Sequence, residues 1–277
     1  MLDTFREIFG SLSRNKLRSI ATGFAVACGI FLLIILQGTS NGILHTFERA
    51  SKGFSFDAIR VFPGFTSKPY NGIEEGRRIK LDDTDSEVTM QNFPDELSSA
   101  IAQISHTANS ASFGKNYLSN VSLQGAQPST QEMEAIQLLE GRFINKIDLQ
   151  ELRKVIVISD ENREDLFKHG ERVINQQVRI DGITFTVVGI YKDDGMMSGN
   201  DFYVPFTTLK TIYGKGYEID QLQLKSKSLD TEEKNDAFEI AFRKVMGVKH
   251  EFAPDDRSAL WIRNSASENA DMTKAKN

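Results

Sequence analysis

The stretch QVRIDGITFTVVGIY, from Gln177 to Tyr191, decides how the largest part of this 277-residue chain folds. Apolar and polar residues alternate on both sides of Asp181 and Gly182, as they do in strands with one buried face. An Asp-Gly pair between two such runs is the strongest short-range signal for a β-hairpin. The stretch therefore predicts two antiparallel strands joined by a tight turn.

Strands and helices also alternate upstream of this hairpin. The apolar run VIVIS, Val155–Ser159, predicts a buried strand, and ENREDLFKHG, residues 161–170, predicts a helix. Two alternating runs, residues 105–113 and 116–125, predict an antiparallel pair that turns at Gly114. A strand is expected in FDAIRVF, residues 56–62.

One further helix is expected around Pro94, a residue that suits the first turn of a helix. Leu97, Ile101 and Ile104 follow it at helical spacing.

The C-terminal part adds more elements of both kinds. Strands are expected in DFYVPF, residues 201–206, and DQLQLKS, residues 220–226, with a short helix at 207–213 between them. The amphipathic run from Thr231 to Gly247 predicts a helix that ends at the glycine. The region beyond residue 45 is therefore expected to be a mixed α+β domain.

A transmembrane helix is expected near the start of the chain. IATGFAVACGIFLLIIL, from Ile20 to Leu36, is uncharged, and at about 1.5 Å per residue it reaches roughly 25 Å. Weakly polar neighbours extend the span to residues 19–44, enough for a hydrocarbon layer of about 30 Å. Three alternatives are a cleaved signal peptide, a lipoprotein signal ending at Cys28, and a buried core helix. A signal peptide lacks an obvious A-x-A cleavage site here.

Basic residues precede this span and set its orientation. Lys and Arg beside a span stay on the cytoplasmic side, which places the N-terminus inside and the bulk of the chain in the periplasm of a bacterium. The cytoplasmic-side anchors are Arg14, Lys16 and Arg18.

Residues 1–18 predict an amphipathic helix at the cytoplasmic interface. Two interpretations are open: an anchor in the lipid headgroups, or a lever that passes force from a cytoplasmic partner to the span. The residues alone favour the anchor. Its apolar face consists of Phe5, Ile8, Phe9 and Leu12, together with Leu2.

Charge and cysteine content exclude little except nucleic-acid binding. Lys and Arg number 33 against 38 Asp and Glu, and the resulting formal charge of −5 provides no basic field for a nucleic acid. The single cysteine says nothing about the redox compartment.

No catalytic, metal or cofactor site is expected. The sequence holds no phosphate-binding P-loop, no G-x-S-x-G elbow and no HExxH pattern. The histidines are expected at the surface, and the acidic groups in solvated loops. A Gly-rich loop with Met196 and Met197 is a candidate contact for a periplasmic partner or an apolar substrate. The residues considered for a metal are His45, His106, His169 and His250, and the acidic groups Asp82, Asp83, Asp85, Asp193, Asp194, Asp255 and Asp256.

Several spaced elements resemble ABC transporter permeases of the MacB/FtsX type. They are LLEGRFINKIDLQELRKVIVIS from Leu138, ENREDLFKHG, and VRIDGITFTVVGIYKDD followed by DFYVPFTTL. The resemblance covers the interfacial helix at 1–18, the span at 19–44 and a MacB-like periplasmic core domain at 45–277. It implies an α+β, porter-like subdomain with a mainly β insertion at about 126–216.

The resemblance also implies a function. A permease of this type is not itself the enzyme: a separate cytoplasmic ATPase subunit binds ATP, and the permease couples it to periplasmic movement in efflux or mechanotransmission. Homo- or heterodimers and a periplasmic adaptor are implied partners. The amphipathic helix then becomes the ATPase contact, which favours the lever. The family has three more spans after the periplasmic domain, so the resemblance implies the N-terminal part of a permease.

Two other functions are kept as alternatives. The first is a single-span, membrane-anchored periplasmic binding or scaffold protein that engages no ATPase. The second, with less support, is a secreted hydrolase. No pattern in the sequence indicates a substrate or the direction of transport.

Overall fold

A computed structural model describes residues 17, 20, 21, 23–35, 58–168, 170–193, 201–229 and 231–264. The chain divides into two compact units, Met1–Arg49 and Ala50–Asn277, and the second contains both sheets described below.

The first unit contains a helix. Residues 23–35 are helical, and their large apolar side chains are exposed, by 71% at Phe24 and 44% at Ile35. Across the described residues, no helix has both the length and the apolar character required to cross a membrane. The expected span at 19–44 includes residues outside the described ranges, and it stays a prediction.

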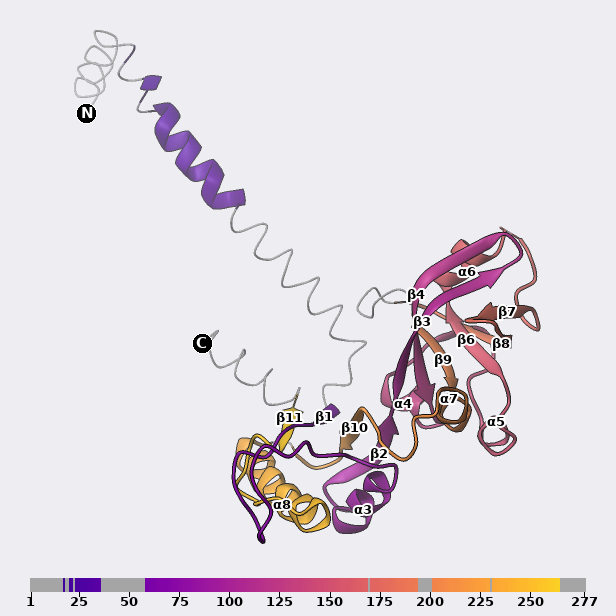
Figure 1. Cartoon of the computed structure of the whole chain (residues 1–277). Coiled ribbons are helices and arrows are strands. Elements are labelled where there is room, and N and C mark those ends of the chain that lie inside the picture. The colour runs from indigo at the N-terminus through magenta and orange to yellow at the C-terminus, as the bar shows by residue number, and fades with distance from the viewer. Residues whose placement is uncertain are drawn as a thin grey trace, which may run out of the picture. The chain divides into compact units, whose positions relative to one another are not determined.

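The described part of the second unit begins and ends in an antiparallel four-stranded sheet, in the order β11-β1-β10-β2. Helices α3 and α8 lie side by side against it (Figure 1), and Phe93, just after α3, meets Phe238 of α8 edge to face at 5.1 Å. The elements are β1 (Ala58–Pro63), α3 (Asp85–Asn92), β2 (Leu97–Gln103), β10 (Gln221–Ser226), α8 (Glu232–His250) and β11 (Leu260–Asn264).

A seven-stranded mixed sheet, in the order β5-β8-β6-β9-β4-β3-β7, is inserted between β2 and β10. Four short helices accompany it: α4 (Thr130–Met133), α5 (Lys146–Gln150), α6 (Asp160–Leu166) and α7 (Phe206–Tyr213). Its strands are β3 (Ser105–Phe113), β4 (Asn116–Ala126), β5 (Leu138–Gly141), β6 (Val155–Ser159), β7 (Gln177–Ile180), β8 (Ile183–Tyr191) and β9 (Asp201–Pro205).

The insert, defined here as residues 105–213, starts earlier than the boundary expected near residue 126. The reason is that β3 and β4 pair with each other, and β4 pairs in parallel with β9, so the long hairpin belongs to the seven-stranded sheet. The first strand of that sheet is β3, which follows β2 after a single residue, Ile104.

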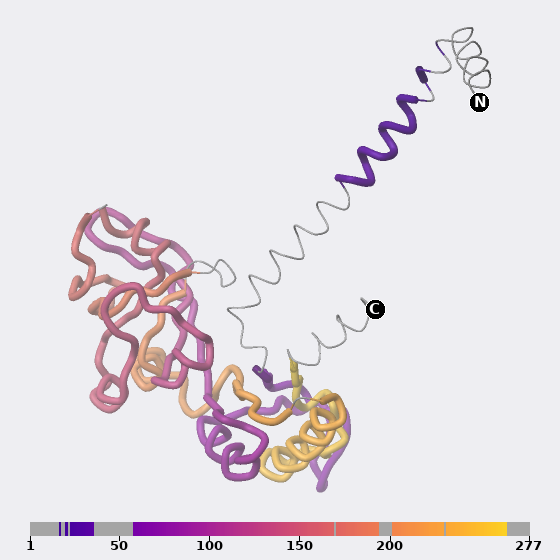
Figure 2. The backbone as a smooth tube through the Cα atoms, turned by 180° about the vertical axis from the view of Figure 1, so that it is seen from behind, coloured from indigo at the N-terminus to yellow at the C-terminus, as the bar shows by residue number. Residues whose placement is uncertain are grey.

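Both described ends of the four-stranded sheet lie together. In the antiparallel pair of β1 and β11, Ile59 faces Asn264, so the first residues of β1 lie beside the last residues of β11. Figure 2 shows the indigo start and the yellow end of this unit side by side. The chain thus enters and leaves the sheet at one place.

The centre of the seven-stranded sheet, at β6 and β9, is buried on both faces, which explains the unbroken apolar run in β6. Ile156 and Ile158 belong to the main core, which includes residues of both sheets, whereas Val155 and Val157 belong to a second, smaller cluster. Successive side chains of a strand point to opposite faces, so both faces require apolar residues.

Most expected elements are confirmed. The Asp181-Gly182 turn joins β7 and β8, whose residues Ile180 and Ile183 face each other, and β3 pairs with β4 as expected. The expected helix over Leu97, Ile101 and Ile104 is wrong: residues 97–103 form β2, and the helix of this region, α3, precedes Pro94. Antiparallel pairing with β10 provides the hydrogen bonds that decide the outcome.

Helix α8 also continues past its expected end at Gly247 and reaches His250. The glycine serves a close contact rather than a stop, because a Cβ atom there would lie 2.7 Å from the carbonyl oxygen of Phe252.

Gly189 in β8 provides a test of the packing in the seven-stranded sheet. A Cβ atom at this position would lie 2.2 Å from the carbonyl oxygen of Arg142, a backbone atom that cannot move aside cheaply. We expect Gly189→Ala to lower the free energy of unfolding by about 3 kcal/mol, measured by denaturant titration with circular dichroism. Gly114→Ala is the control, because Gly114 has a positive φ and open space around it, and should cost about 1 kcal/mol. Equal losses of free energy of unfolding in the two variants would contradict a close contact between position 189 and the carbonyl oxygen of Arg142.

Candidate functional site: the junction between the two sheets

The residues named as sites from the sequence lie outside the described part of the chain. The structure therefore does not test whether they come together. They are the ATPase-contact face Phe5, Ile8, Phe9 and Leu12, the anchors Arg14, Lys16 and Arg18, and the loop residues Met196 and Met197.

The described residues instead show a junction between the two sheets, with two chain crossings. The first crossing is at Ile104, and the second is the return segment, residues 214–220. The two crossings are neighbours, because Gln103 at the end of β2 faces Gln221 at the start of β10. Asp220 of the return segment accepts hydrogen bonds from the amide and hydroxyl of Ser105, at 2.6 and 2.9 Å.

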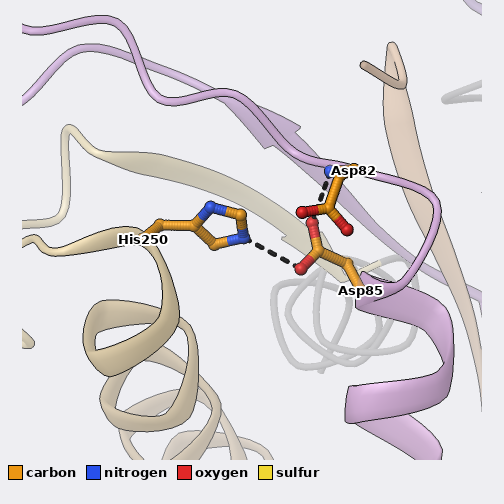
Figure 3. Close-up of side chains that lie close together, drawn as sticks. All are labelled: Asp82, Asp85 and His250. Carbon is orange, nitrogen blue, oxygen red and sulfur yellow. Dashed lines mark hydrogen bonds and ion pairs between the residues drawn. The ribbon is translucent and has the colours of Figure 1, made fainter. Parts of the chain in front are cut away.

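An ion cluster of Asp82, Asp85, Lys249 and His250 lies on the four-stranded side of this junction. Lys249 Nζ lies 2.9 Å from Asp82 Oδ1 and 2.5 Å from Asp85 Oδ1, and it also donates to the hydroxyl of Thr84 at 2.7 Å. His250 Nε2 lies 2.8 Å from the same Asp85 oxygen (Figure 3). The cluster thereby fixes the C-terminal end of α8 to the turn before α3.

Because this cluster is buried, its charges affect the stability of the folded domain more than exposed charges would. The carboxylate of Asp85 is fully buried and the side chain of His250 is 10% exposed. Burial alone would lower the pKa of Lys249, but the hydrogen bonds that its ammonium donates to Asp85 and Asp82 outweigh burial and raise that pKa. Burial likewise acts to raise the pKa of Asp82, whereas hydrogen bonds from Thr84 and Lys249 dominate and lower it.

Neighbouring ion pairs connect the same turn to the insert and to the return segment. Lys210 of α7 pairs with Asp83 at 2.5 Å, and Arg78 pairs with Glu218 at 2.5 Å. The backbone of the return segment also contacts this region, since the amide of Ile219 donates to the carbonyl of Leu81. The turn at residues 82–85 therefore contacts α8, the insert and the return segment together.

Three side chains of the cluster have the spacing of a metal site, but their charges do not fit one. The ligand atoms of Asp82, Asp85 and His250 all lie within 4.8 Å of one another. The ammonium group of Lys249 already binds both carboxylates, so a divalent cation would have to displace it and would meet its positive charge. The cluster is better described as an internal ion pair with a histidine partner.

An open cleft of about 370 Å³ borders the cluster. Its basic side chains face carboxylates of the same region, such as Glu218 for Arg78, and the guanidinium of Arg77 donates to the carbonyls of His250 and Glu251. Such compensation argues against a strong anion site. The lining residues are Arg77, Arg78, Lys80, Lys249, His250 and Glu251.

The structure corrects the expectation of solvated surroundings for Asp85, Asp256 and His250, whereas Asp255 is exposed as expected. Asp85 is buried, as is Asp256, whose carboxylate accepts hydrogen bonds from the amide and hydroxyl of Ser67 at 2.6 and 2.7 Å. His250 is held by Asp85, whereas His106 stacks on Tyr213 with ring centroids 3.6 Å apart. His45, His169 and Asp194 lie outside the described residues.

Sequence reasoning missed the cluster because its members are far apart in the chain. Asp85 and Lys249 are separated by 164 positions, so no local spacing connects them. The available signal was weak: Asp85 in an otherwise polar run, and a Lys-His pair just beyond the predicted end of the last helix at Gly247.

The fold is that of the extracytoplasmic domains of ABC-type transporters. The periplasmic region of MacB from Actinobacillus actinomycetemcomitans matches with a TM-score of 0.63 at 15% identity, covering 80% of this chain and 95% of that domain. The extracellular domain of the transporter YknZ from Gram-positive bacteria matches with a TM-score of 0.60 at 16% identity, covering 75% and 100%.

The chain belongs to the family of the MacB-like periplasmic core domain, whose model matches residues 19–240. An uncharacterized ABC transporter permease, YvrN of Bacillus subtilis strain 168, is 27% identical over 70% of this chain and 47% of its own length. The macrolide export ATP-binding/permease protein MacB of Syntrophobacter fumaroxidans is 25% identical over 76% of this chain and 30% of its own length. The chain thus spans less than half of these curated relatives.

Removal of the lysine tests the ion cluster. Lys249→Met leaves two partly or fully buried carboxylates without their cation, and we expect a loss of about 3 kcal/mol in the free energy of unfolding at neutral pH. Lys244→Met, at an exposed lysine of the same helix, should change it by less than about 0.5 kcal/mol.

The same variant should show a defined pH dependence. The pKa of Asp82 is lowered in the folded protein, so the stability it contributes is present above its ordinary pKa of 3.8 and disappears as the pH falls through the lowered value. The difference in the free energy of unfolding between Lys249→Met and the native chain should therefore become smaller in acid. A difference that is constant from neutral pH to about pH 2.5 would rule out the ionic origin.

Proposed function

We propose that this chain is a permease subunit, or the N-terminal part of one, in an ABC-type efflux or mechanotransmission system. In this system a separate cytoplasmic ATPase binds and hydrolyses ATP, and the chain relays the motion to its periplasmic domain. The observation that carries the proposal is the family match over residues 19–240, which includes both the apolar segment and most of the domain. The relatives that match are permeases by name.

The topology of the domain supports a role in relaying movement. The chain enters and leaves the four-stranded sheet beside the pair Ile59 and Asn264, so force applied there acts on β1 and β11 at one edge. The insert is connected to the same sheet through two neighbouring crossings. A pull on the first sheet is thus transmitted to the insert through the junction.

The membrane arrangement is part of the proposal. Residues 19–44 would cross the inner, plasma membrane of a bacterium once, with Arg14, Lys16 and Arg18 on the cytoplasmic side and the bulk of the chain in the periplasm. The face of Phe5, Ile8, Phe9 and Leu12 would contact the ATPase. Two permeases would act as a homo- or heterodimer, and a periplasmic adaptor is a further partner, with the Met196–Met197 loop as its candidate contact.

Charge substitution on the amphipathic face tests the ATPase contact. In Phe5→Asp/Ile8→Asp, two buried contacts would be replaced by carboxylates, and we expect at least a tenfold loss of ATPase co-purification from membranes, equivalent to about 1.4 kcal/mol. Ser13→Asp adds a charge to the polar face and is the matched control. Membrane fractionation measures separately how much of each variant stays associated with the membrane.

The outcomes separate the lever from the anchor. Loss of ATPase binding with retained membrane association supports coupling. Retained ATPase binding by the double variant, or no ATPase bound to the native chain in its own membranes, favours the membrane-anchored scaffold instead.

A further inference from the structure

The junction has a second polar contact, on the opposite face of the four-stranded sheet from α8, and it is centred on Glu134 at the end of α4. Glu134 Oε2 accepts a hydrogen bond from the hydroxyl of Tyr203 in β9 at 2.7 Å. Its other oxygen, Oε1, accepts one from the side-chain amide of Gln103 in β2 at 3.3 Å. One carboxyl group of the insert is therefore bound from both sheets.

Charged and polar groups from both sheets face this carboxyl, and the hydroxyl of Tyr191 in β8 also interacts electrostatically with it. From the four-stranded sheet, Arg60 of β1 attracts it, and Gln223 of β10 forms a side-chain hydrogen bond with it. From the insert, Asp201 of β9 repels it. Arg263 of β11, opposite Arg60 in the sheet, acts with burial to lower the pKa of Arg60.

A second pair reinforces the same contact at its exposed rim. Lys225 of β10 lies 3.0 Å from Glu132, two residues before Glu134. The side chain of Glu132 is 85% exposed, so this ion pair is screened by water and contributes little. The charge of the partly enclosed Glu134 carboxyl therefore has a larger effect on this contact than the charge of the exposed Glu132 carboxyl.

Burial is the largest influence on Glu134 and raises its pKa above the ordinary 4.5, although the Tyr203 hydroxyl and Arg60 act in the opposite direction. Where the two sheets separate, the carboxyl would face water and its pKa would fall back. The closed junction consequently binds a proton more tightly than an open one. The contribution of the Glu134 carboxyl to closure is complete below its ordinary pKa. This contribution is lost as the pH rises through the raised pKa of the closed junction.

We propose that Glu134 is a proton-dependent latch between the two sheets, which holds the insert on the four-stranded sheet more tightly when its carboxyl carries a proton than when it is ionised. The role of the latch in transport rests on the proposed permease function, whereas the latch itself is a property of the domain.

Distance measurements in the full-length chain test the latch without any ATPase present. Spin labels are placed at Tyr117→Cys in the insert and Lys244→Cys in α8, both exposed, in a Cys28→Ser background. Pulsed electron resonance then gives the distribution of distances at a series of pH values that starts below the ordinary pKa of 4.5 and ends at about pH 8. We expect a closed population that declines with rising pH, by about tenfold in the closed-to-open ratio for each unit by which closure raises the pKa.

Two variants identify the titrating group. Glu134→Gln is permanently neutral and nearly the same shape, so its distribution should stay closed at every pH. Glu132→Gln removes the neighbouring exposed carboxylate and should leave the pH response unchanged. A pH response that persists in Glu134→Gln, or that disappears in Glu132→Gln, overturns the proposal.

Tyr203→Phe provides a second and independent measurement. It removes the hydroxyl that stabilises the ionised carboxylate, so the midpoint of closure should shift to higher pH. A midpoint that is unchanged or lower would also overturn the latch. Because no ATPase is present, these results stay valid if the ATPase contact at Phe5 and Ile8 is not found.

Discussion

The pairing of β2 with β10 is the constraint on which the rest of the domain depends. Because Gln103 faces Gln221, the insert leaves and re-enters the four-stranded sheet at adjacent positions. Its placement therefore relies on side chains that contact the sheet beyond these two crossings. The ion cluster around Lys249 orders the turn that meets the return segment, and Glu134 binds the outer face of the sheet.

The two contacts respond to solution conditions in different ways. Ionised groups stabilise the first, where the pKa of Asp82 is lowered and that of Lys249 is raised. In the second, burial raises the pKa of Glu134 and disfavours its charge. Acidification to a moderate pH thus strengthens the Glu134 contact while the ion cluster is still charged. The domain therefore has one contact, the ion cluster, that is unchanged at moderate pH, and a second, at Glu134, whose strength depends on pH.

How much the sequence predicted depended on how local each signal was. The Asp181-Gly182 hairpin and the apolar β6 were correct, because turn chemistry and double-sided burial act within a few residues. The run at residues 97–101 failed because a spacing of four positions fits both one helical turn and two strand repeats, and pairing with a distant strand decided it. The ion cluster required Asp85 and Lys249 to meet across 164 positions, which no local pattern encodes.

The neighbouring positions of β1 and β11 have a consequence for the order of folding during synthesis. All seven strands of the insert are complete by Pro205, so they can pair while the ribosome is still translating the remainder. The four-stranded sheet is different, because one edge of β1 is covered only after β11, which contains Trp261, has been synthesised. Until then β1 exposes an unpaired edge, the kind of surface on which chaperones and proteases act.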